Sequence, residues 1–208
     1  MGRDLGTASL LILLNPNHLI PPTPMKVPFM YGALIAIFNA ILILVLFFLG
    51  YHNDAAKLAS LGVIPSIISV IISIVGIALA VRAKRAELPA SEKFSYGSAF
   101  VTALLTGIIA GLLGAVFYLL YVQLINPELM AVQMQMQSDK LAAKGLSSQQ
   151  IEQANKIAGF FLKPVIQFLF AAVFSCIFAA ITALIVAAFF RRDAAPLHTA
   201  PATPPPLA

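Results

Sequence analysis

The side chains that could support catalysis or bind a metal are few and widely separated. The three histidines are His18, His52 and His198, and Cys176 is the single cysteine. A structural Zn²⁺ site needs about four Cys, His or carboxylate ligands together, and a lone cysteine forms no intrachain disulfide. The sequence also contains no GxSxG, HExxH, P-loop or GxGxxG pattern. We therefore expect no catalytic residue, no metal, no cofactor and no enzyme.

Asn39 is the candidate polar group at membrane depth, because it lies near the middle of an apolar segment. Gln123 and Gln167 are expected closer to the outer surface. A polar side chain inside a membrane either hydrogen-bonds to another helix or marks a solute pathway. We favour an interhelical hydrogen bond. The alternative, a transport role, requires a water-filled cavity that reaches Asn39 from one side.

Small residues recur every four positions at Gly107, Gly111 and Ala115. This spacing places them on one helix face, where a second helix can approach closely. The approaching helix belongs either to the same bundle or to a second copy of the chain. We favour packing within one bundle and keep homodimerisation as the alternative.

Four long apolar segments carry these residues. The chain is 60% hydrophobic and 10% charged, whereas soluble domains are about 45–50% hydrophobic and about 25% charged. In lipid only a helix satisfies the backbone of one segment, and about 20 residues cross the hydrocarbon core. The sequence therefore predicts an all-α fold, a four-helix transmembrane bundle with spans at 29–49, 62–81, 97–122 and 165–190.

The basic residues predict the orientation of this bundle. Eight of the 13 Lys and Arg residues lie before the first span, between the second and third, or after the fourth. Because cytoplasmic connections are enriched in Lys and Arg, we expect both chain termini in the cytoplasm. Tyr118 and Tyr121 then belong to the outer aromatic belt, and His52 to a solvated loop.

Residues 126–163 are expected to form a periplasmic, amphipathic helical hairpin. Asn126, Pro127 and Glu128 combine a capping residue, a proline for the first helical position and an acid for the first turn. Gly145 can close this first helix. The hairpin either covers the bundle or contacts a partner, and Asn126, Pro127 and Glu128 are the candidate contact residues.

The second helix of the hairpin begins with a capping box, formed by Ser147 and Gln150. Its apolar residues recur at three- and four-residue spacing, which gives one apolar face: Ile151, Ala154, Ala158 and Phe161.

The two ends of the chain differ from the membrane domain at 29–192. Residues 1–28 form a leader whose apolar stretch is too short to span a membrane. This leader is either disordered or the product of a mis-assigned start, with translation beginning at Met25 instead of Met1. Residues 193–208 are rich in proline and alanine, and we expect them to be disordered.

Several short motifs follow one another between residues 25 and 192: Tyr31-Gly32, Phe94-Ser95-Tyr96-Gly97-Ser98-Ala99-Phe100, Tyr118, Tyr121, Asn126-Pro127-Glu128, Lys144-Gly145-Leu146-Ser147 and Ile151-Glu152. In this order they resemble the DUF4199 family of small bacterial membrane proteins of unknown function. The resemblance implies a bacterial inner-membrane location and four helices, and it supplies no activity.

The sequence thus favours a non-enzymatic multi-pass membrane protein that is a structural or accessory partner in the bacterial inner membrane. The expected partners are the lipid bilayer and either a second copy of the chain or another membrane protein, bound through the 126–163 hairpin. The basic residues form no block that would suggest nucleic acid. The alternative is a small transporter or channel subunit that forms a pore only as an oligomer.

Overall fold

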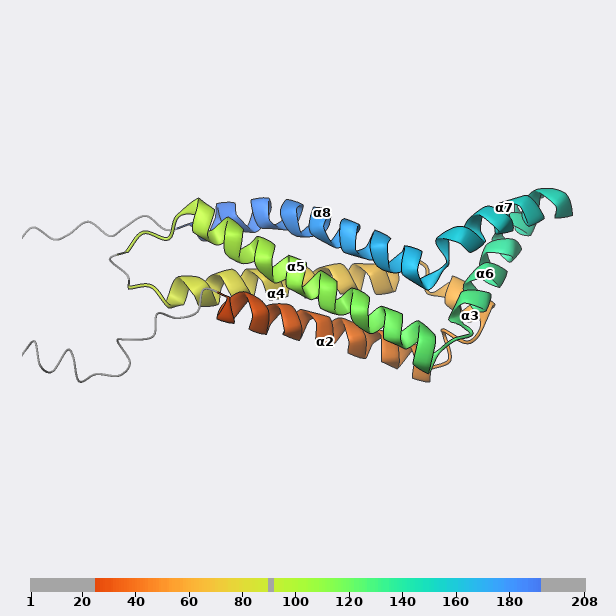
Figure 1. Ribbon diagram of the computed structural model, residues 1–208, viewed down its shortest axis with the longest axis horizontal. Coiled ribbons are helices and arrows are strands. Elements are labelled where there is room, and N and C mark those ends of the chain that lie inside the picture. Colours follow the sequence, from red (N-terminus) through yellow and green to blue (C-terminus); the bar gives the residue numbers. More distant parts are fainter. Residues whose placement is uncertain (1–24, 90–91, 192–208) are drawn as a thin grey trace, which may run out of the picture.

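The computed structural model describes residues 25–89 and 92–191, and their regular secondary structure is helical (Figure 1). Four of the helices are long and apolar enough to cross a membrane, as predicted. They are α2 (Lys26–Phe48), α4 (Ile64–Ala86), α5 (Tyr96–Leu120) and α8 (Pro164–Phe190). The predicted tail and all but residues 25–28 of the predicted leader lie outside the described residues.

Several helix ends differ from the prediction by a few residues, and two of these differences have a clear physical reason. Helix α2 begins at Lys26 and not at 29, because Pro28 in a first turn needs no hydrogen-bond acceptor for its nitrogen. Helix α4 continues past 81 to Ala86. Its last turns carry Arg82, whose long side chain can keep its charged group in water while the helix leaves the lipid.

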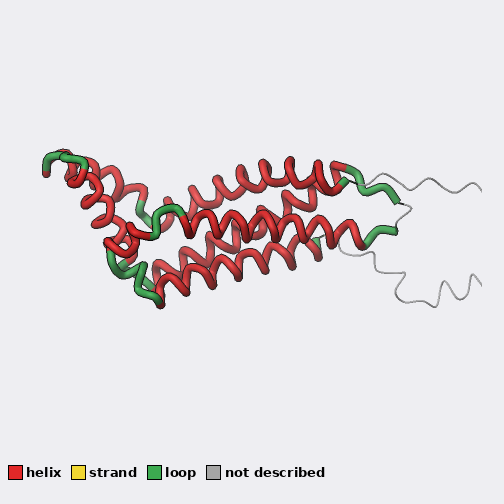
Figure 2. The backbone as a smooth tube through the Cα atoms, turned by 180° about the vertical axis from the view of Figure 1, so that it is seen from behind, coloured by secondary structure: helices red, strands yellow, loops and turns green. Residues whose placement is uncertain are grey.

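The four long helices run antiparallel in succession, and α5 packs against the other three (Figures 1 and 2). The contact between α5 and α8 is the most extensive. We call one end of the bundle the hairpin end, where the short helix α3 (Ala55–Ser60) and the helices α6 (Leu129–Ala143) and α7 (Ser148–Phe161) lie. The opposite end is the arginine end, where α4 finishes beside Arg82 and Arg85 and α8 finishes beside Arg191.

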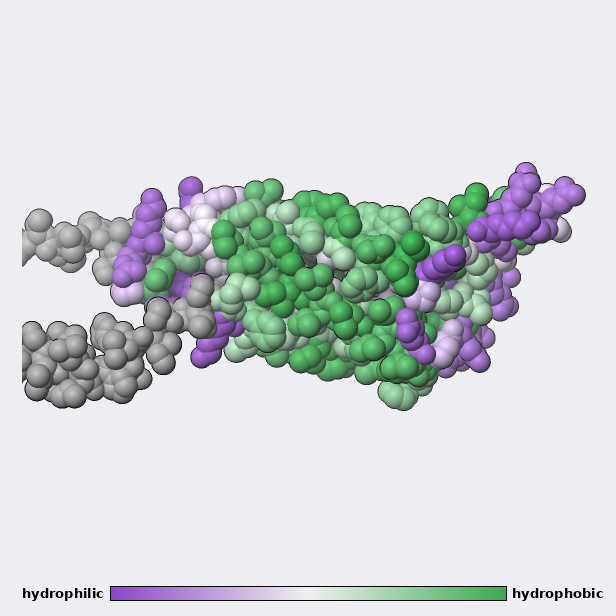
Figure 3. Space-filling model, viewed as in Figure 1, coloured by the Kyte–Doolittle hydropathy of each residue, from purple (hydrophilic) through white to green (hydrophobic). Residues whose placement is uncertain are grey.

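The outer surface of the bundle is apolar between these two ends. Phe29, Val173 and Ile185 are each more than half exposed. Figure 3 shows a continuous hydrophobic belt over the long helices, with hydrophilic residues gathered at both ends. Lipid can cover such a belt, whereas water would leave it as a large unstable apolar patch. The chain is therefore a membrane protein.

The tight packing of the bundle is concentrated near the arginine end. In α4 the buried residues are Ile77, Ala80 and Val81, and in α8 they lie between Ala179 and Ala187. Phe94, in the connection before α5, joins this core with only 1% of its surface exposed. A second, smaller core of Tyr121, Val122 and Leu129 lies at the hairpin end.

Residues between α5 and α8 form the two helices α6 and α7. Gly145 has a φ of 81°, a left-handed conformation that glycine adopts without strain, and it follows α6. The capping box of α7 is confirmed: the Gln150 N–H donates to Ser147 Oγ, and the Ser147 N–H donates to Gln150 Oε1. Asn155 Nδ2 donates to Ser138 Oγ at 2.8 Å, which ties α7 to α6.

Candidate functional site

The hairpin half of the bundle contains open space because small side chains line its helices. On α4, Ser66, Ser69 and Ser73 share one face at three- and four-residue spacing. On α5, Gly111 and Gly114 occupy the same region. Small residues on facing helices fill the space only where the backbones approach closely, and elsewhere they leave a cavity.

Two cavities result from this arrangement. The inner cavity lies between all four long helices and has a volume of about 260 Å³. The outer cavity has a volume of about 420 Å³, and its walls include residues of α3 and α6 at the hairpin end. Both cavities are lined by Asn39, Ile43, Ser69 and Tyr118. The two cavities are therefore neighbours, with the inner one in the middle of the bundle and the outer one nearer its hairpin end.

Asn39 presents an unused hydrogen-bond acceptor in this space. Its Nδ2 donates to the Ile35 carbonyl of its own helix at 3.0 Å. Its Oδ1 is buried and has no hydrogen-bond partner among the described residues. A buried polar atom without a partner costs about 1–3 kcal/mol. The interhelical hydrogen bond expected for Asn39 is therefore wrong, and the amide oxygen is available to a molecule in the cavity.

Two of the serine hydroxyls that line the inner cavity, those of Ser73 and Ser175, donate to carbonyls of their own helices. Ser73 Oγ donates to the Ser69 carbonyl at 2.8 Å, and Ser175 Oγ donates to the Ala172 carbonyl at 2.9 Å. A hydroxyl whose proton is engaged in this way still has lone pairs that accept. Together with Asn39 Oδ1, these groups make a wall that offers mainly acceptors.

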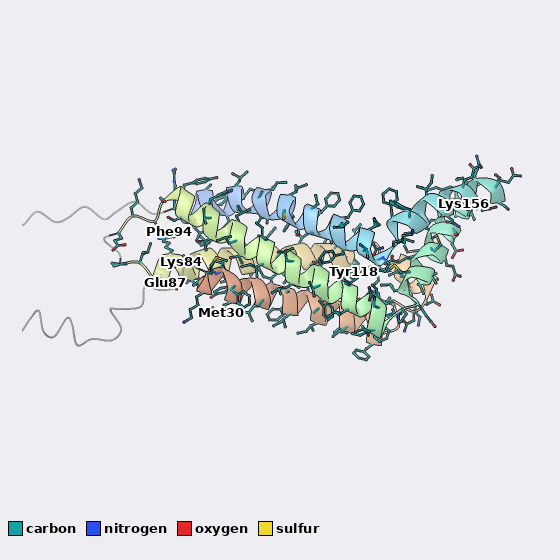
Figure 4. All side chains as sticks on the ribbon, in the orientation of Figure 1. Met30, Lys84, Glu87, Phe94, Tyr118 and Lys156 are labelled. Atoms are coloured by element: carbon teal, nitrogen blue, oxygen red, sulfur yellow. The ribbon has the colours of Figure 1, made fainter. Side chains whose placement is uncertain are left out.

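Tyr118 lies where the two cavities meet, near the hairpin end of α5 (Figure 4). Its side chain is half-buried, and the Gln133 side chain of α6 lies within hydrogen-bonding reach of its hydroxyl. Gln133 also lines the outer cavity. The hairpin thus contributes directly to the wall that surrounds the entrance to the inner cavity.

A buried polar junction fixes the hairpin to the bundle. Tyr121 opens a five-residue π-helical turn, Tyr121–Ile125, and none of its surface is exposed. Its hydroxyl lies 2.7 Å from His52 Nδ1. Asn126 Nδ2 lies within 3.3 Å of three acceptors: Tyr121 Oη, the His52 carbonyl and Asn53 Oδ1. We call His52, Asn53, Tyr121 and Asn126 the junction.

A neutral His52 fits this geometry. The Tyr121 hydroxyl accepts from Asn126, so it is free to donate its own proton to His52 Nδ1. That arrangement requires neutral imidazole with its hydrogen on Nε2. Burial also lowers the pKa of His52 below its usual value of 6.5, because the charged form is poorly solvated there.

The junction corrects three expectations. Tyr121 does not join an aromatic belt, because it is completely buried. His52 is part-buried and hydrogen-bonded, not solvated. Asn126 is not the capping residue of α6, whose first residue is Leu129 and whose N-cap position is Glu128. Its side chain donates inward instead, while Pro127 and Glu128 are exposed.

Gly107 and Gly111 pack within the bundle. A Cβ added at Gly107 would lie 2.5 Å from the Cβ of Ala179, and one at Gly111 would collide with Ser175. Both contacts are on α8 of the same chain, and Ala115 is 4% exposed. This face is therefore covered and not free for a second copy of the chain. Cys176 is exposed on the outer surface of α8.

A family model for DUF4199, described as a protein of unknown function, matches residues 30–192. The chain belongs to the DUF4199 family. No curated protein and no solved structure gives a significant match. The DUF4199 match includes both cavities, the junction and the hairpin, so all of these are parts of the family domain.

The motifs that resemble DUF4199 include several packing residues. A Cβ added at Gly32 would lie 2.8 Å from Ile109 Cγ2 on α5. Phe94 and Tyr121 are buried in the two cores. The cavity walls at Ser69 and Ser73 lie outside those motifs. Their serine spacing is visible in the sequence, but the sequence does not reveal whether such a face is packed or open.

Among the described residues, no group of three His, Cys, Asp or Glu side chains lies close enough together to hold a metal ion. The side chains lining the two cavities include no Asp, Glu, Lys or Arg. The arrangement can therefore bind a neutral molecule through hydrogen bonds and apolar contacts, and it offers a carboxylate or an amine no oppositely charged partner.

Proposed function

We propose that this chain is a non-enzymatic membrane protein that binds a small, uncharged, hydrogen-bond-donating molecule in the cavity beside Asn39. The observation that carries the proposal is the unpaired, buried Asn39 Oδ1 of a residue that lines two neighbouring cavities, the outer of which lies at the hairpin end. Such a binding unit belongs to the class of small transporters, which was the alternative expectation from the sequence.

The chemistry of the walls supports this ligand class. Ser73 and Ser175 donate to carbonyls of their own helices, as does Asn39 Nδ2, and the free Asn39 Oδ1 calls for a donor on the ligand. Residues such as Leu42, Leu46 and Val70 make the rest of the outer wall apolar. Cavities that bind small molecules are commonly apolar with a few convergent polar groups. An alcohol or amide with an apolar body fits both features.

The cavity is closed toward the arginine end in this conformation. On the side of the arginine end, the long helices pack tightly around Ile77, Thr106 and Ala183, each with at most 1% of its surface exposed. A transported molecule would therefore need this tight core to open at a later step. The cavity is formed by a single chain, so binding itself requires no oligomer.

The proposed setting is a bacterial inner membrane. The basic side chains of the arginine end favour the cytoplasmic side, which places both termini there and the hairpin in the periplasm. Under this orientation the cavity takes its ligand from the periplasmic side.

A second candidate is the accessory role, in which the hairpin binds another membrane protein. The observation that favours it is the exposed apolar surface of α7, where Ile157 is 64% and Phe160 is 53% exposed. The hairpin also projects beyond the ends of the long helices (Figure 1). An accessory protein should be purified together with a stoichiometric protein partner.

One purification tests both candidates. Protein extracted in mild detergent is expected to carry a neutral donor-bearing compound, detected by mass spectrometry of the organic extract. Asn39→Leu should lower the amount of bound compound about tenfold. The reason is that the variant loses one hydrogen bond, and about 1.4 kcal/mol of binding free energy corresponds to a tenfold change in affinity. Gln123→Leu is the matched control, because Gln123 is exposed and lines neither cavity.

Equal amounts of the compound in the Asn39→Leu and Gln123→Leu proteins would contradict the binding proposal. Recovery of a stoichiometric protein partner without any such compound would favour the accessory role instead.

A further inference from the structure

The arginine end has a groove on the outside of the bundle, between α4 and α8. Its volume is about 630 Å³, which makes it larger than either internal cavity. The groove is lined by residues of α4 and by the last residue of α8: Val75, Ala78, Leu79, Arg82, Arg85, Ala86 and Phe190. It shares no residue with the cavity beside Asn39.

The groove residues on α4 form one stripe, which is apolar at first and basic toward the end of the helix. Positions 75, 78, 79, 82, 85 and 86 recur at three- and four-residue spacing, so they share a face. The apolar part comes first, within the span, where Val75 is 51% and Leu79 is 44% exposed. The two arginines follow in the last turns before α4 ends at Ala86.

Neither arginine of the groove has an ion-pair partner among the described residues. The only ion pair found in the last turns of α4, within the described part of the chain, joins Lys84 Nζ to Glu87 Oε2 at 2.7 Å (Figure 4). Neither Arg82 nor Arg85 takes part in it. The side chains lining the groove include no acidic group that could neutralise these guanidinium groups.

We infer that this groove binds an anionic phospholipid, with its phosphate at Arg82 and Arg85 and an acyl chain along Val75, Ala78 and Leu79. Guanidinium groups match phosphate oxygens with paired N–H donors. Basic pockets between transmembrane helices at the membrane surface are a recurring form of lipid recognition. The apolar half of the groove faces the hydrocarbon layer. A soluble phosphate makes no favourable contact with this apolar wall, whereas the acyl chain of a membrane lipid already lies at this depth.

The bound lipid has a structural consequence. Phe190 forms the wall on α8, so the lipid contacts the ends of α4 and α8 together. These helices share a smaller contact than α5 and α8 do. An acyl chain in the groove adds contacts between them at the arginine end, close to the tight core.

The test measures lipid retention by native mass spectrometry of the full chain released from mixed phosphatidylglycerol and phosphatidylcholine membranes. The wild-type protein should retain phosphatidylglycerol selectively. One basic side chain near an anionic surface is worth about fivefold in binding, so the Arg82→Gln/Arg85→Gln protein should lose about tenfold or more of this retention. Lys84→Gln removes the same kind of charge from the same helix turn and should change it little, because Lys84 pairs with Glu87.

A second measurement distinguishes binding of the whole lipid from binding of its headgroup alone. Glycerol phosphate at the same concentration should not displace phosphatidylglycerol, because it lacks the acyl chain that fits the apolar wall. Equal retention of the two lipids by the wild-type protein would overturn the inference. Equal losses in the Arg82→Gln/Arg85→Gln and Lys84→Gln proteins would overturn it as well, and so would displacement by glycerol phosphate.

Discussion

Replacing Gly107 by alanine is expected to destabilise the bundle by about 1–3 kcal/mol, even though alanine is the better helix former. The added methyl group would lie 2.5 Å from the Cβ and 3.1 Å from the Cα of Ala179. One of these atoms belongs to the backbone of α8, so no side-chain rotation relieves the overlap. The helices must separate, which loosens the largest helix contact in the bundle.

Gly114→Ala provides the matched control, because it is the same substitution on the same helix. A Cβ added at Gly114 meets nothing within 4 Å. Its free energy of unfolding should stay unchanged or rise by up to about 1 kcal/mol, through helix propensity alone. Unfolding of both proteins by denaturing detergent, followed by circular dichroism, measures the difference. Equal effects of the two substitutions would show that α5 and α8 are not packed through Gly107.

Lowering the pH from about 7.5 to about 5.5 is expected to loosen the junction that fixes the hairpin. Since the folded-state pKa of His52 is lowered, its contribution to stability is complete above its usual value of 6.5 and is lost as the pH falls through the folded-state value. A protonated His52 Nδ1 carries a hydrogen, so the Tyr121 hydroxyl would face two donors, His52 and Asn126, and lose its acceptor.

Hydrogen exchange of the amides in α3 and in the π-helical turn measures this loosening. Exchange should accelerate at the lower pH, after correction for the intrinsic pH dependence, in the wild-type protein. In His52→Gln the amide oxygen can accept from Tyr121 at either pH, so the acceleration should disappear. The same acceleration in His52→Gln would rule out His52 as its cause.

The four spans were predictable because each segment must form its own backbone hydrogen bonds and present apolar side chains to the lipid. The absence of charge and the length of an apolar run decide between a helix and a loop without any knowledge of its neighbours. The capping box of α7 was predictable for a similar reason, since Ser147 and Gln150 are three positions apart. Such local rules use only residues that are close in the sequence.

The cavity and the junction depend on residues that are distant in the sequence. His52 and Tyr121 are 69 positions apart, and no spacing rule brings them together. Small residues are also ambiguous by themselves: Gly107 marks a tight contact with α8, whereas the neighbouring Gly114 borders open space. The difference depends on where α8 lies, which the sequence of α5 does not contain.

Asn39 shows how a polar residue can be located correctly and still be given the wrong partner. Its depth in α2 follows from its place in the apolar run. Its hydrogen bond to the Ile35 carbonyl follows from a local i−4 geometry that competes with any bond to another helix. The remaining Oδ1 has no partner, and we therefore infer that the cavity is a binding site.

The proposed binding site requires a water-accessible cavity in the hairpin half of the bundle, closed toward the arginine end. Cysteine labelling in lipid nanodiscs, where both membrane faces are accessible, tests it directly. Ser69→Cys and Thr106→Cys are compared in a Cys176→Ser background with a small charged thiol reagent. Ser69 lines both cavities, whereas Thr106 is completely buried in the tight core. The unmodified chain, with Cys176 on its lipid-facing surface, serves as the control for thiols that only lipid covers.

Rapid modification of Ser69→Cys, with slow or no modification of Thr106→Cys and of the native Cys176, is the predicted result. If Ser69→Cys reacted as slowly as Thr106→Cys in the folded protein, the cavity would not be open to water and the proposed binding site would be wrong.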